Sequence, residues 1–396
     1  MRLTAAAQYF TMSPDARHAD AVPRLADAQR VVVKLGSSLL IDPATGELQR
    51  AWLESVAAEL AGMQRAGQQV LLVSSGAIAL GRAYLELEPG QLRLDEYQAA
   101  AAAGQIILAH AYQELMAAHG IKVAQILLTP EDTEDRRRYL NARSTLQTLL
   151  DLGVLPVINE NDTVATQEIR YGDNDRLGAR VAEMISADCL VLLSDVAGLY
   201  DADPSVRSDA SLIPVVHDIT DELAEIAGAS RTAFGSGGMA TKLAAARICM
   251  SAGCSTVIAS GQLEAPLDAI MGGGACTWFL PHSTPLAARK QWIAGTLQAR
   301  GRLDIDAGAA AALAAGSSLL PVGVTRVNGD FARGDAVDVT HGGRLVARGL
   351  VAYDSAEAQR IVGCRSADIA ARIGYEGRNE IIHRDNLILL PASVPA

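Results

Sequence analysis

The stretch from Pro156 to Val181 carries the densest group of side chains that could do chemistry. Six Asp or Asn residues and one Glu fall within seventeen positions: Asn159, Glu160, Asn161, Asp162, Asp173, Asn174 and Asp175. Carboxylates and amides of this kind can pair with a substrate ammonium or organise a metal-bound nucleotide. A solvated loop is the alternative, because Asn and Asp also favour turns.

Two lysines give the second chemical signal. The chain has thirty arginines but only four lysines, at positions 34, 122, 242 and 290. Lys34 precedes the turn Gly36-Ser37-Ser38. Lys242 is the second-last residue of the glycine-rich run FGSGGMATKL, which is expected to open a helix reaching Ala252. Backbone amides at such turns can bind phosphate. The GxxxxGK spacing of a Walker motif is absent, and each turn alone fits a plain strand-to-helix connection equally well.

Apolar runs define the elements that must position these residues. Strands are expected at 30–35, 70–74, 123–128, 154–158, 190–193 and 257–259, with helices at 52–66, 95–119, 138–152 and 177–187. Asp175 is the predicted N-cap of the last helix. Continuous apolar strands separated by helices predict an α/β fold with a mainly parallel sheet sandwiched by helices. Ligands then belong at the carboxyl ends of the strands, where Ser75 and the pair Ser194-Asp195 stand.

Composition limits the class of protein. The chain has 396 residues, 49% hydrophobic and 20% charged, and its net charge is −11. The negative charge argues against general affinity for nucleic acid or an anionic membrane. Five cysteines without a CxxC pair predict buried thiols in a reducing cytoplasm. Residues 1–24 match neither a secretory signal nor an anchor, and we expect a mobile extension there.

The composition changes near residue 280. We expect a first domain at 25–280, a linker at 281–300 and a small, mostly β domain at 301–392. Its strands are predicted at 322–327, 336–339 and 345–351, with a helix at 356–362. Every candidate catalytic residue precedes position 243, so we expect the small domain to be dispensable for chemistry.

The candidate residues together fit phosphoryl transfer. This reaction needs cations to offset charge on the transferring oxygens, a carboxylate to organise them with magnesium, and donors to position the acceptor. The residues alone do not decide which carboxylate does which task.

The motifs also resemble a known family. VVVKLGSS, VSSGAIALG, LNARSTL, PVINENDTVAT, GDNDRL, LLSDVAGLY and GSGGMATKL, in this order, look like the glutamate 5-kinase family, whose members have the amino-acid-kinase fold. The resemblance covers about residues 28–280, and the run from GSSLLPVGVTRVNGDFARGD onward resembles a PUA domain. Serine stands at 37, 74, 194 and 236, where the family often has threonine.

The resemblance implies a role for each matching residue. Lys34 and Lys242 would straddle the transferring phosphoryl group, and Asp175, with Asp173 nearby, would orient the lysines and Mg²⁺-ATP. Glutamate would be bound by Ser75, Asp162, Asn174 and Asn159. The nucleotide would be held by Lys34, Ser194, Asp195, Ser236, Gly237, Gly238, Met239, Ala240, Thr241 and Lys242.

The implied activity is ATP-dependent phosphorylation of the γ-carboxylate of L-glutamate, the first step of proline biosynthesis. The implied partners are feedback inhibitor L-proline, a downstream glutamyl-phosphate reductase and further copies of the chain in a dimer or tetramer. The alternatives are a related kinase for N-acetylglutamate, aspartate or a nucleoside monophosphate, and an RNA-binding PUA protein. The last alternative lacks support from charge, because residues 301–396 hold ten arginines, no lysine and eleven acids.

Overall fold

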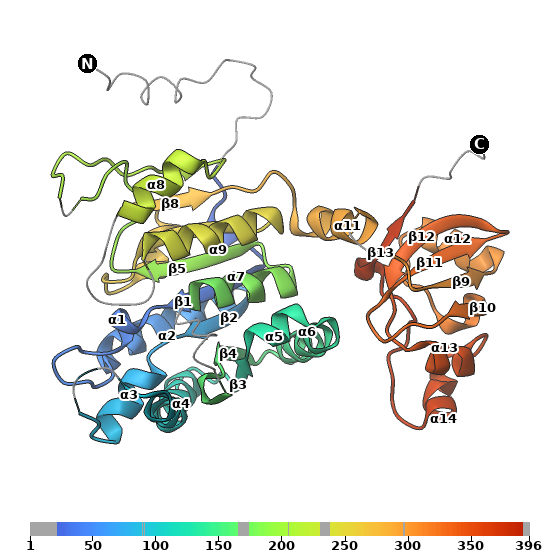
Figure 1. The fold of residues 1–396 in the computed structure, drawn as a ribbon, viewed down its shortest axis with the longest axis horizontal. Helices are drawn as coiled ribbons and strands as arrows, with labels where there is room; N and C mark the ends of the chain where they lie inside the picture. The colour runs from blue at the N-terminus through green and yellow to red at the C-terminus, as the bar shows by residue number, and fades with distance from the viewer. Residues whose placement is uncertain are drawn as a thin grey trace, which may run out of the picture.

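An eight-stranded sheet organises the first two thirds of the chain (Figure 1). The computed structural model describes residues 22–88, 90, 92–164, 174–204, 206–229, 238–295 and 298–390. The strand order is β3-β4-β2-β1-β5-β7-β8-β6. The strands are β1 (Arg30–Leu35), β2 (Gln69–Ser74), β3 (Val123–Leu128), β4 (Leu155–Glu160), β5 (Cys189–Ser194), β6 (Val215–Val216), β7 (Ser255–Ser260) and β8 (Cys276–Phe279).

The prediction of a mainly parallel sheet is confirmed. β1 pairs in parallel with β2 and β5, β2 and β3 with β4, and β5 with β7. Only β8 runs antiparallel, against β7, and the short β6 extends the edge beside it. The inner parallel strands β1, β2, β4 and β5 are buried on both faces, as their continuous apolar sequences require, whereas the edge strand β3 is mostly half-buried or exposed.

Helices cover both faces of this sheet. The first helices are α1 (Ser37–Leu40), α2 (Arg50–Arg65), α3 (Ala77–Tyr84), α4 (Leu94–Ala117), α5 (Pro130–Glu134) and α6 (Arg136–Asp151). The later ones are α7 (Asn174–Ile185), α8 (Asp221–Ala229), α9 (Met239–Ser251) and α10 (Pro266–Met271). One core joins α2, α4 and α10 to alternate strand residues, and a second core joins α6, α7 and α9 to the others. The period of two along each strand thus divides the apolar residues between two cores.

Two glycines bring α3 and α4 unusually close. A Cβ atom on Gly81 would collide with the Ala100 carbonyl, and one on Gly104 would collide with the Ala77 carbonyl. The turn before α3 contains Gly76 at φ +98°, a conformation that glycine adopts without strain. Backbone contact between the helices therefore fixes the turn that follows β2.

Residues 301–390 form a second, five-stranded sheet in the order β10-β9-β11-β12-β13, with a separate core. Its strands are β9 (Gly301–Ile305), β10 (Val324–Gly329), β11 (Ala336–His341), β12 (Arg344–Leu350) and β13 (Leu387–Leu389). Its helices are α12 (Ala307–Ala314), α13 (Ser355–Ile361) and α14 (Ile369–Ile373). The small, mostly β domain expected from the sequence is present.

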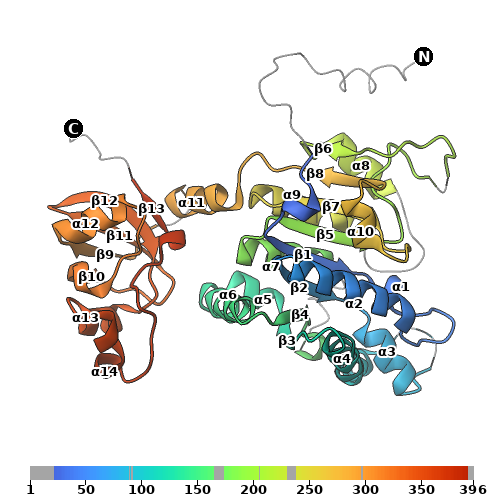
Figure 2. The same ribbon diagram turned by 180° about the vertical axis from the view of Figure 1, so that it is seen from behind.

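The segment predicted as a linker contains helix α11 (Pro285–Gly295), which lies between the two sheets in both views (Figures 1 and 2). Ile293 of α11 is fully buried in a small cluster with Ala336 and Leu350 of the second sheet. The domain limits themselves stay predictions, and residues 1–21 of the expected extension lie outside the described residues.

Two local predictions are wrong. Asp175 is the second residue of α7 and not its N-cap, because the helix already begins at Asn174. Asn159 and Glu160 belong to β4 and not to the connection after it. The five cysteines are free thiols, four of them buried and Cys276 half-buried. No helix in the described parts of the chain is long and apolar enough to span a membrane.

Candidate active site

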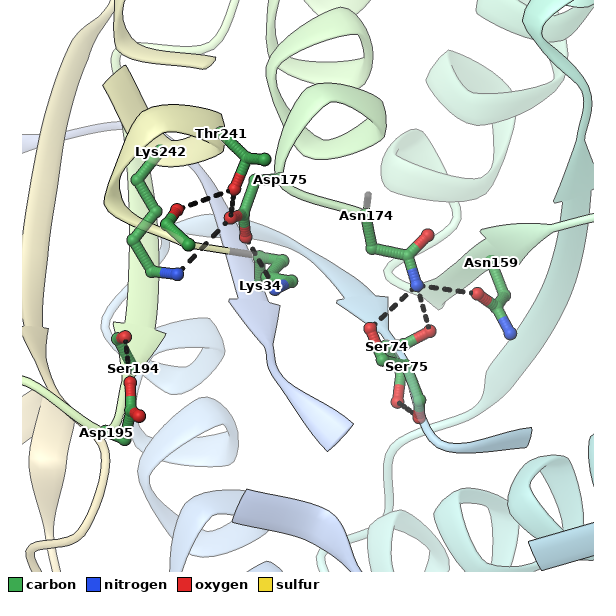
Figure 3. Close-up of polar contacts among 11 residues, drawn as sticks. Lys34, Ser74, Ser75, Asn159, Asn174, Asp175, Ser194, Asp195, Thr241 and Lys242 are labelled. Atoms are coloured by element: carbon green, nitrogen blue, oxygen red, sulfur yellow. Dashed lines mark hydrogen bonds and ion pairs between the residues drawn. The ribbon is translucent and has the colours of Figure 1, made fainter. Parts of the chain in front are cut away.

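The candidate residues meet where β1, β2, β4 and β5 end and where α7 and α9 begin (Figure 3). Parallel strands place their carboxyl ends at one edge of the sheet, and the two helices present their N-terminal ends there. Figure 3 shows a charged group around Asp175 and, beside it, an amide and hydroxyl group around Asn174. Asn174 and Asp175, which are neighbours in sequence, therefore belong to two adjacent groups of contacts.

The charged group consists of one carboxylate between two lysines. Lys34 Nζ lies 2.5 Å from Asp175 Oδ1, and Lys242 Nζ lies 3.4 Å from Asp175 Oδ2. Asp175 is 0% exposed, Lys34 7% and Lys242 5%. Burial alone would raise the pKa of Asp175, but the two ammonium groups outweigh it and lower the pKa below its usual value. Two ammonium groups beside one carboxylate suit an anionic ligand.

Thr241 supports this group from the first turn of α9. Its Oγ1 lies 2.9 Å from Asp175 Oδ2 and 2.8 Å from the Gly238 carbonyl oxygen, so its one proton can go to either acceptor. Gly238 is the N-cap of α9 and provides no side-chain cap. The first amides of α9 thus have no capping side chain, as a phosphate site at a helix N-terminus requires.

The second group is built around the Asn174 side chain. Its Nδ2 lies 2.8 Å from Ser75 Oγ, 2.9 Å from Asn159 Oδ1 and 3.2 Å from the Ser74 carbonyl oxygen. Three acceptors around Nδ2 identify the nitrogen of this amide. The other atom, Asn174 Oδ1, is buried and accepts no hydrogen bond from any of the described residues. A buried acceptor without a donor costs free energy, and a ligand N–H group would satisfy it.

Asp162 follows β4, and Tyr97 of α4 donates to its Oδ1 over 3.4 Å. Asp162 is 8% exposed, and its burial raises the pKa of the carboxyl group to about 6. No ion pair joins it to a lysine or arginine in the described part of the chain. It is therefore a carboxylate that a substrate cation would stabilise.

Sequence analysis did not identify the polar residues of α4 that support this second group. Tyr97 contacts Asp162, Gln105 accepts from Asn159 Nδ2 over 2.9 Å, and Tyr112 shares a 2.7 Å hydrogen bond with Ser74. Their separations of eight and seven residues place them on one face of the helix. A polar stripe on an alanine-rich helix was the signal that could have found them.

The predicted nucleotide residues are only partly described. Ser194 donates to Asp195 over 2.9 Å at the end of β5, and Figure 3 shows this pair on the opposite side of Lys34 from Asn174. Met239 and Ala240 form the start of α9. Asp173, Ser236 and Gly237 lie outside the described residues. Among the described residues no cluster of three or more His, Cys, Asp or Glu side chains could hold a metal ion.

Comparisons with known proteins agree with this architecture. Residues 29–260 match the model of the amino acid kinase family, and residues 301–373 match that of the PUA domain. The glutamate 5-kinase of Paramagnetospirillum magneticum is 58% identical over 92% of this chain and 99% of the relative. That of Rhodospirillum rubrum is 59% identical over 90% of this chain and 96% of the relative.

A solved carbamate kinase from Giardia lamblia, bound to AMP-PNP, superimposes with a TM-score of 0.47 at 19% identity, covering 65% of this chain and all of that one. The sequence matches reach much further, because they span both domains at more than half identity. The chain belongs to the amino acid kinase family and, within it, to the glutamate 5-kinases.

Proposed function

We propose that this protein transfers the γ-phosphoryl group of ATP to the γ-carboxylate of L-glutamate, giving L-glutamyl 5-phosphate and ADP. The observation that carries the proposal is the adjacency of the two groups of contacts. Two buried lysines that share one carboxylate adjoin a second group in which, among the described residues, Asn174 Oδ1 has no donor and Asp162 has no lysine or arginine partner. The first group suits a transferring phosphoryl group, and the second suits the ammonium end of an amino acid.

The lysines provide electrostatic stabilisation of the transfer. A γ-carboxylate oxygen attacks the γ-phosphorus while the bond to the ADP oxygen breaks, and the negative charge on the moving oxygens lies between Lys34 and Lys242. The nucleophile is already ionised at neutral pH, so no base has to remove a proton from it. Asp175 contacts both ammonium groups and keeps them apart at a fixed geometry.

The nucleotide would bind through the start of α9 and the end of β5. The amides at Met239 and Ala240 and the cation of Lys242 favour phosphate groups. Magnesium bound to the nucleotide phosphates would neutralise further charge, with Asp175 and Asp173 orienting it.

Recognition of glutamate would rest on its α-ammonium group. Asp162 offers a partly buried carboxylate, and Asn174 Oδ1 offers an acceptor without a donor. A bound ammonium would satisfy both and would lower the pKa of Asp162. Ser75 and Asn159, held together by Asn174 Nδ2, would contact the remaining polar atoms of the substrate.

The competing acceptors fit this site less well. N-Acetylglutamate presents a neutral amide instead of an ammonium and would leave the Asp162 carboxylate unpaired. Aspartate is one methylene shorter between its ammonium and its side-chain carboxylate. A role restricted to RNA binding through the PUA domain would not use the buried lysine pair at all.

The proposal includes partners and a location. L-Proline shares the cationic nitrogen and α-carboxylate of glutamate but lacks the acceptor carboxylate, so we expect it to raise the apparent KM for glutamate. The acyl phosphate can cyclise when its own amine attacks, so a reductase that consumes it promptly is the expected partner. We also propose a homo-oligomer and a cytoplasmic location, as the sequence analysis predicts.

A panel of acceptors tests the proposed function. ADP release would be measured with L-glutamate, N-acetylglutamate, L-aspartate and a nucleoside monophosphate, with hydroxylamine present to convert any acyl phosphate into a hydroxamate. L-Glutamate should give ADP and hydroxamate in equal amounts, and the other acceptors should give little of either. Equal turnover of glutamate and N-acetylglutamate would overturn the assignment of the acceptor.

A further inference from the structure

A cavity of about 560 Å³ lies between the two domains, away from the candidate active site. The first domain contributes α6 and α11, which lie on the side that faces the second sheet in both views (Figures 1 and 2). The second domain contributes the end of β12 and the segment before β13. Cavities of this size are typical of small-molecule sites.

Arginines dominate the charged lining of this interdomain cavity. Five arginines line it, against three aspartates, in a chain whose net charge is −11. The five are Arg30, Arg143, Arg289, Arg333 and Arg378. None of them forms an ion pair with a carboxylate in the described part of the chain. Their hydrogen bonds go to neutral groups instead.

Arg143 and Arg289 share a single neutral acceptor. Arg143 Nη1 lies 2.9 Å from Asn386 Oδ1, and Arg289 Nη2 and Nε lie 2.8 and 3.2 Å from the same oxygen. Burial and then the charge of Arg289 lower the pKa of Arg143 to about 9. Arg289 is buried and Arg143 is half-buried, and the acceptor that they share is a neutral amide oxygen instead of the carboxylate that such cations normally require.

The other three arginines also contact neutral groups only. Arg30 donates to the Gln69 side chain over 2.6 and 2.9 Å and to the Ile185 carbonyl. Arg378, which is exposed at the rim, donates to Ser144 Oγ over 2.8 Å. Arg333 donates to the Ala352 carbonyl over 2.6 Å.

The short polar contacts of the three aspartates in the cavity are with groups other than the side chains of these five arginines. Asp188 Oδ2 accepts the backbone N–H groups of Gln29 and Arg30 over 2.9 and 2.8 Å. Asp151 accepts from the Gln147 side chain over 2.8 Å. Asp385 lies 3.4 Å from the His383 ring and 3.8 Å from Arg384. Attraction at longer range from Asp188, Asp151 and Asp385 offsets part of the charge of Arg30 and Arg143. Five arginines against three aspartates still leave a net positive charge for a ligand to balance.

We infer that this interdomain cavity binds a small phosphate-bearing anion, with Arg143 and Arg289 as the central ligands. A guanidinium group offers a planar fork of donors that matches phosphate oxygens, and such charge-assisted hydrogen bonds are the strong ones. The arginines come from both domains, so the bound anion connects them. The site does not depend on which acceptor the kinase phosphorylates.

Calorimetric titration of the full-length protein tests this inference. The probes are inorganic phosphate, pyrophosphate and a sugar phosphate, which distinguish a free phosphate from a phosphate ester as the preferred ligand. The variant Arg143→Gln/Arg289→Gln removes both central cations. It should weaken binding of the best probe by about tenfold or more, since each lost contact is a charge-assisted hydrogen bond.

Two control variants separate this site from other anion sites. Arg207→Gln removes one exposed arginine paired with Asp209, far in sequence from the cavity, and should leave the affinity unchanged. Lys242→Ala removes one cation of the kinase phosphate site but leaves the ion pair between Asp175 and Lys34. This variant should also bind the probe in the cavity as tightly as the unaltered protein does. Loss of binding in Lys242→Ala, full retention in the double variant, or no binding to the unaltered protein would each overturn the inference.

A milder variant covers the case in which the double variant does not fold, as judged by thermal unfolding. Arg378→Gln changes an exposed residue whose one hydrogen bond goes to Ser144. Loss of the Arg378 cation should weaken binding of the best probe by about threefold, as expected for a contact at the rim that solvent screens. An unchanged affinity would count against the cavity as the binding site.

Discussion

A group of cations lies near each end of strand β1, and the two groups have acceptors of different charge. At its carboxyl end Lys34 and Lys242 share the carboxylate of Asp175. At its amino end Arg30 enters the interdomain cavity, where Arg143 and Arg289 share the amide oxygen of Asn386. Helix α7 also spans both places, from Asp175 in its first turn to the Ile185 carbonyl that accepts from Arg30.

The difference lies in the charge of the shared acceptor. The carboxylate of Asp175 neutralises part of the lysine charge whether or not a ligand is bound. The two ammonium groups therefore stay in place, and their remaining positive charge can attract the phosphoryl group. An amide oxygen neutralises no charge, and burial together with the neighbouring charge of Arg289 lowers the pKa of Arg143. The first arrangement suits a site that must release its product, while the second depends on a ligand to complete it.

The largest effect should come from removing a lysine at the carboxyl end of β1. Lys34→Ala and Lys242→Ala should each lower kcat by about a hundredfold or more, the loss typical of an electrostatic stabiliser. Lys34→Arg should not restore the rate, because a planar fork does not replace a compact ammonium. Lys122→Ala is the matched control, since Lys122 is exposed at the start of β3. Unchanged kcat in a folded variant would remove that lysine from the mechanism.

Changing the charge of the shared acceptor, Asp175 in one group and Asn386 in the other, tests the comparison between the two cation groups directly. Asp175→Asn leaves two buried ammonium groups without a carboxylate and should lower the free energy of unfolding by roughly 3–5 kcal/mol. Asn386→Asp gives Arg143 and Arg289 a carboxylate and should raise it by about 1–3 kcal/mol through charge-assisted hydrogen bonds. Denaturant unfolding of both variants measures the two changes. A destabilised Asn386→Asp protein would mean that the arginines are already adequately compensated.

The dependence of glutamate turnover on pH should reveal the role of Asp162, which pairs with no lysine or arginine in the part of the chain that the structure describes. Its pKa of about 6 in the folded protein lies above its ordinary value, so the carboxyl group protonates as the pH falls below 6. A neutral carboxyl cannot pair with the substrate ammonium, and kcat/KM for glutamate should fall by about tenfold per pH unit there. Asp162→Asn should have a low kcat/KM without this pH limb, and its KM should rise more than its kcat falls.

The raised pKa of Asp162 also makes the free energy of unfolding depend on pH. The folded protein binds the Asp162 proton more tightly than the unfolded chain does. The stabilising contribution is therefore present at low pH and is lost as the pH rises through about 6. Comparison of the unaltered protein with Asp162→Asn between pH 4 and 7, by denaturant unfolding, isolates this contribution.

The smallest effect on chemistry should follow removal of the second domain. A chain ending at Arg300 keeps all the residues of the candidate active site, and we expect it to retain glutamate-dependent ADP release. It loses the lining that Arg333, Arg378 and Asn386 give the cavity, so it should no longer bind the phosphate probe. Complete loss of activity in a folded truncated protein would show that the second domain supports the kinase site.

The sequence predicts the parts of the molecule whose residue types are distinctive. The parallel strands follow from their apolar runs, and Lys34, Lys242 and the Asn-rich stretch are conspicuous against an arginine-rich background. The contacts among them depend on side-chain direction across different elements. Thr241 on Asp175 and Asn174 on Ser75 join residues more than sixty positions apart, which no local pattern predicts.

The interdomain cavity was missed for a similar reason. Its arginines are scattered from Arg30 to Arg378 among many others, and only the packing of α11 and α6 against the second domain brings them together. The linker predicted at 281–300 contains helix α11, whose fully buried Ile293 packs against Ala336 and Leu350 of the second domain. A composition change marks a domain boundary without indicating how the domains meet.

The most direct test of the central claim follows the oxygen atoms. The protein would convert ATP and L-glutamate labelled with ¹⁸O in its γ-carboxylate, and the acyl phosphate would be left to cyclise, which releases phosphate. If the carboxylate attacks the γ-phosphorus, each released phosphate carries one oxygen from glutamate, and mass spectrometry should find one ¹⁸O per phosphate. Phosphate without the label would mean that water is the acceptor, and it would contradict transfer to glutamate at the paired lysines.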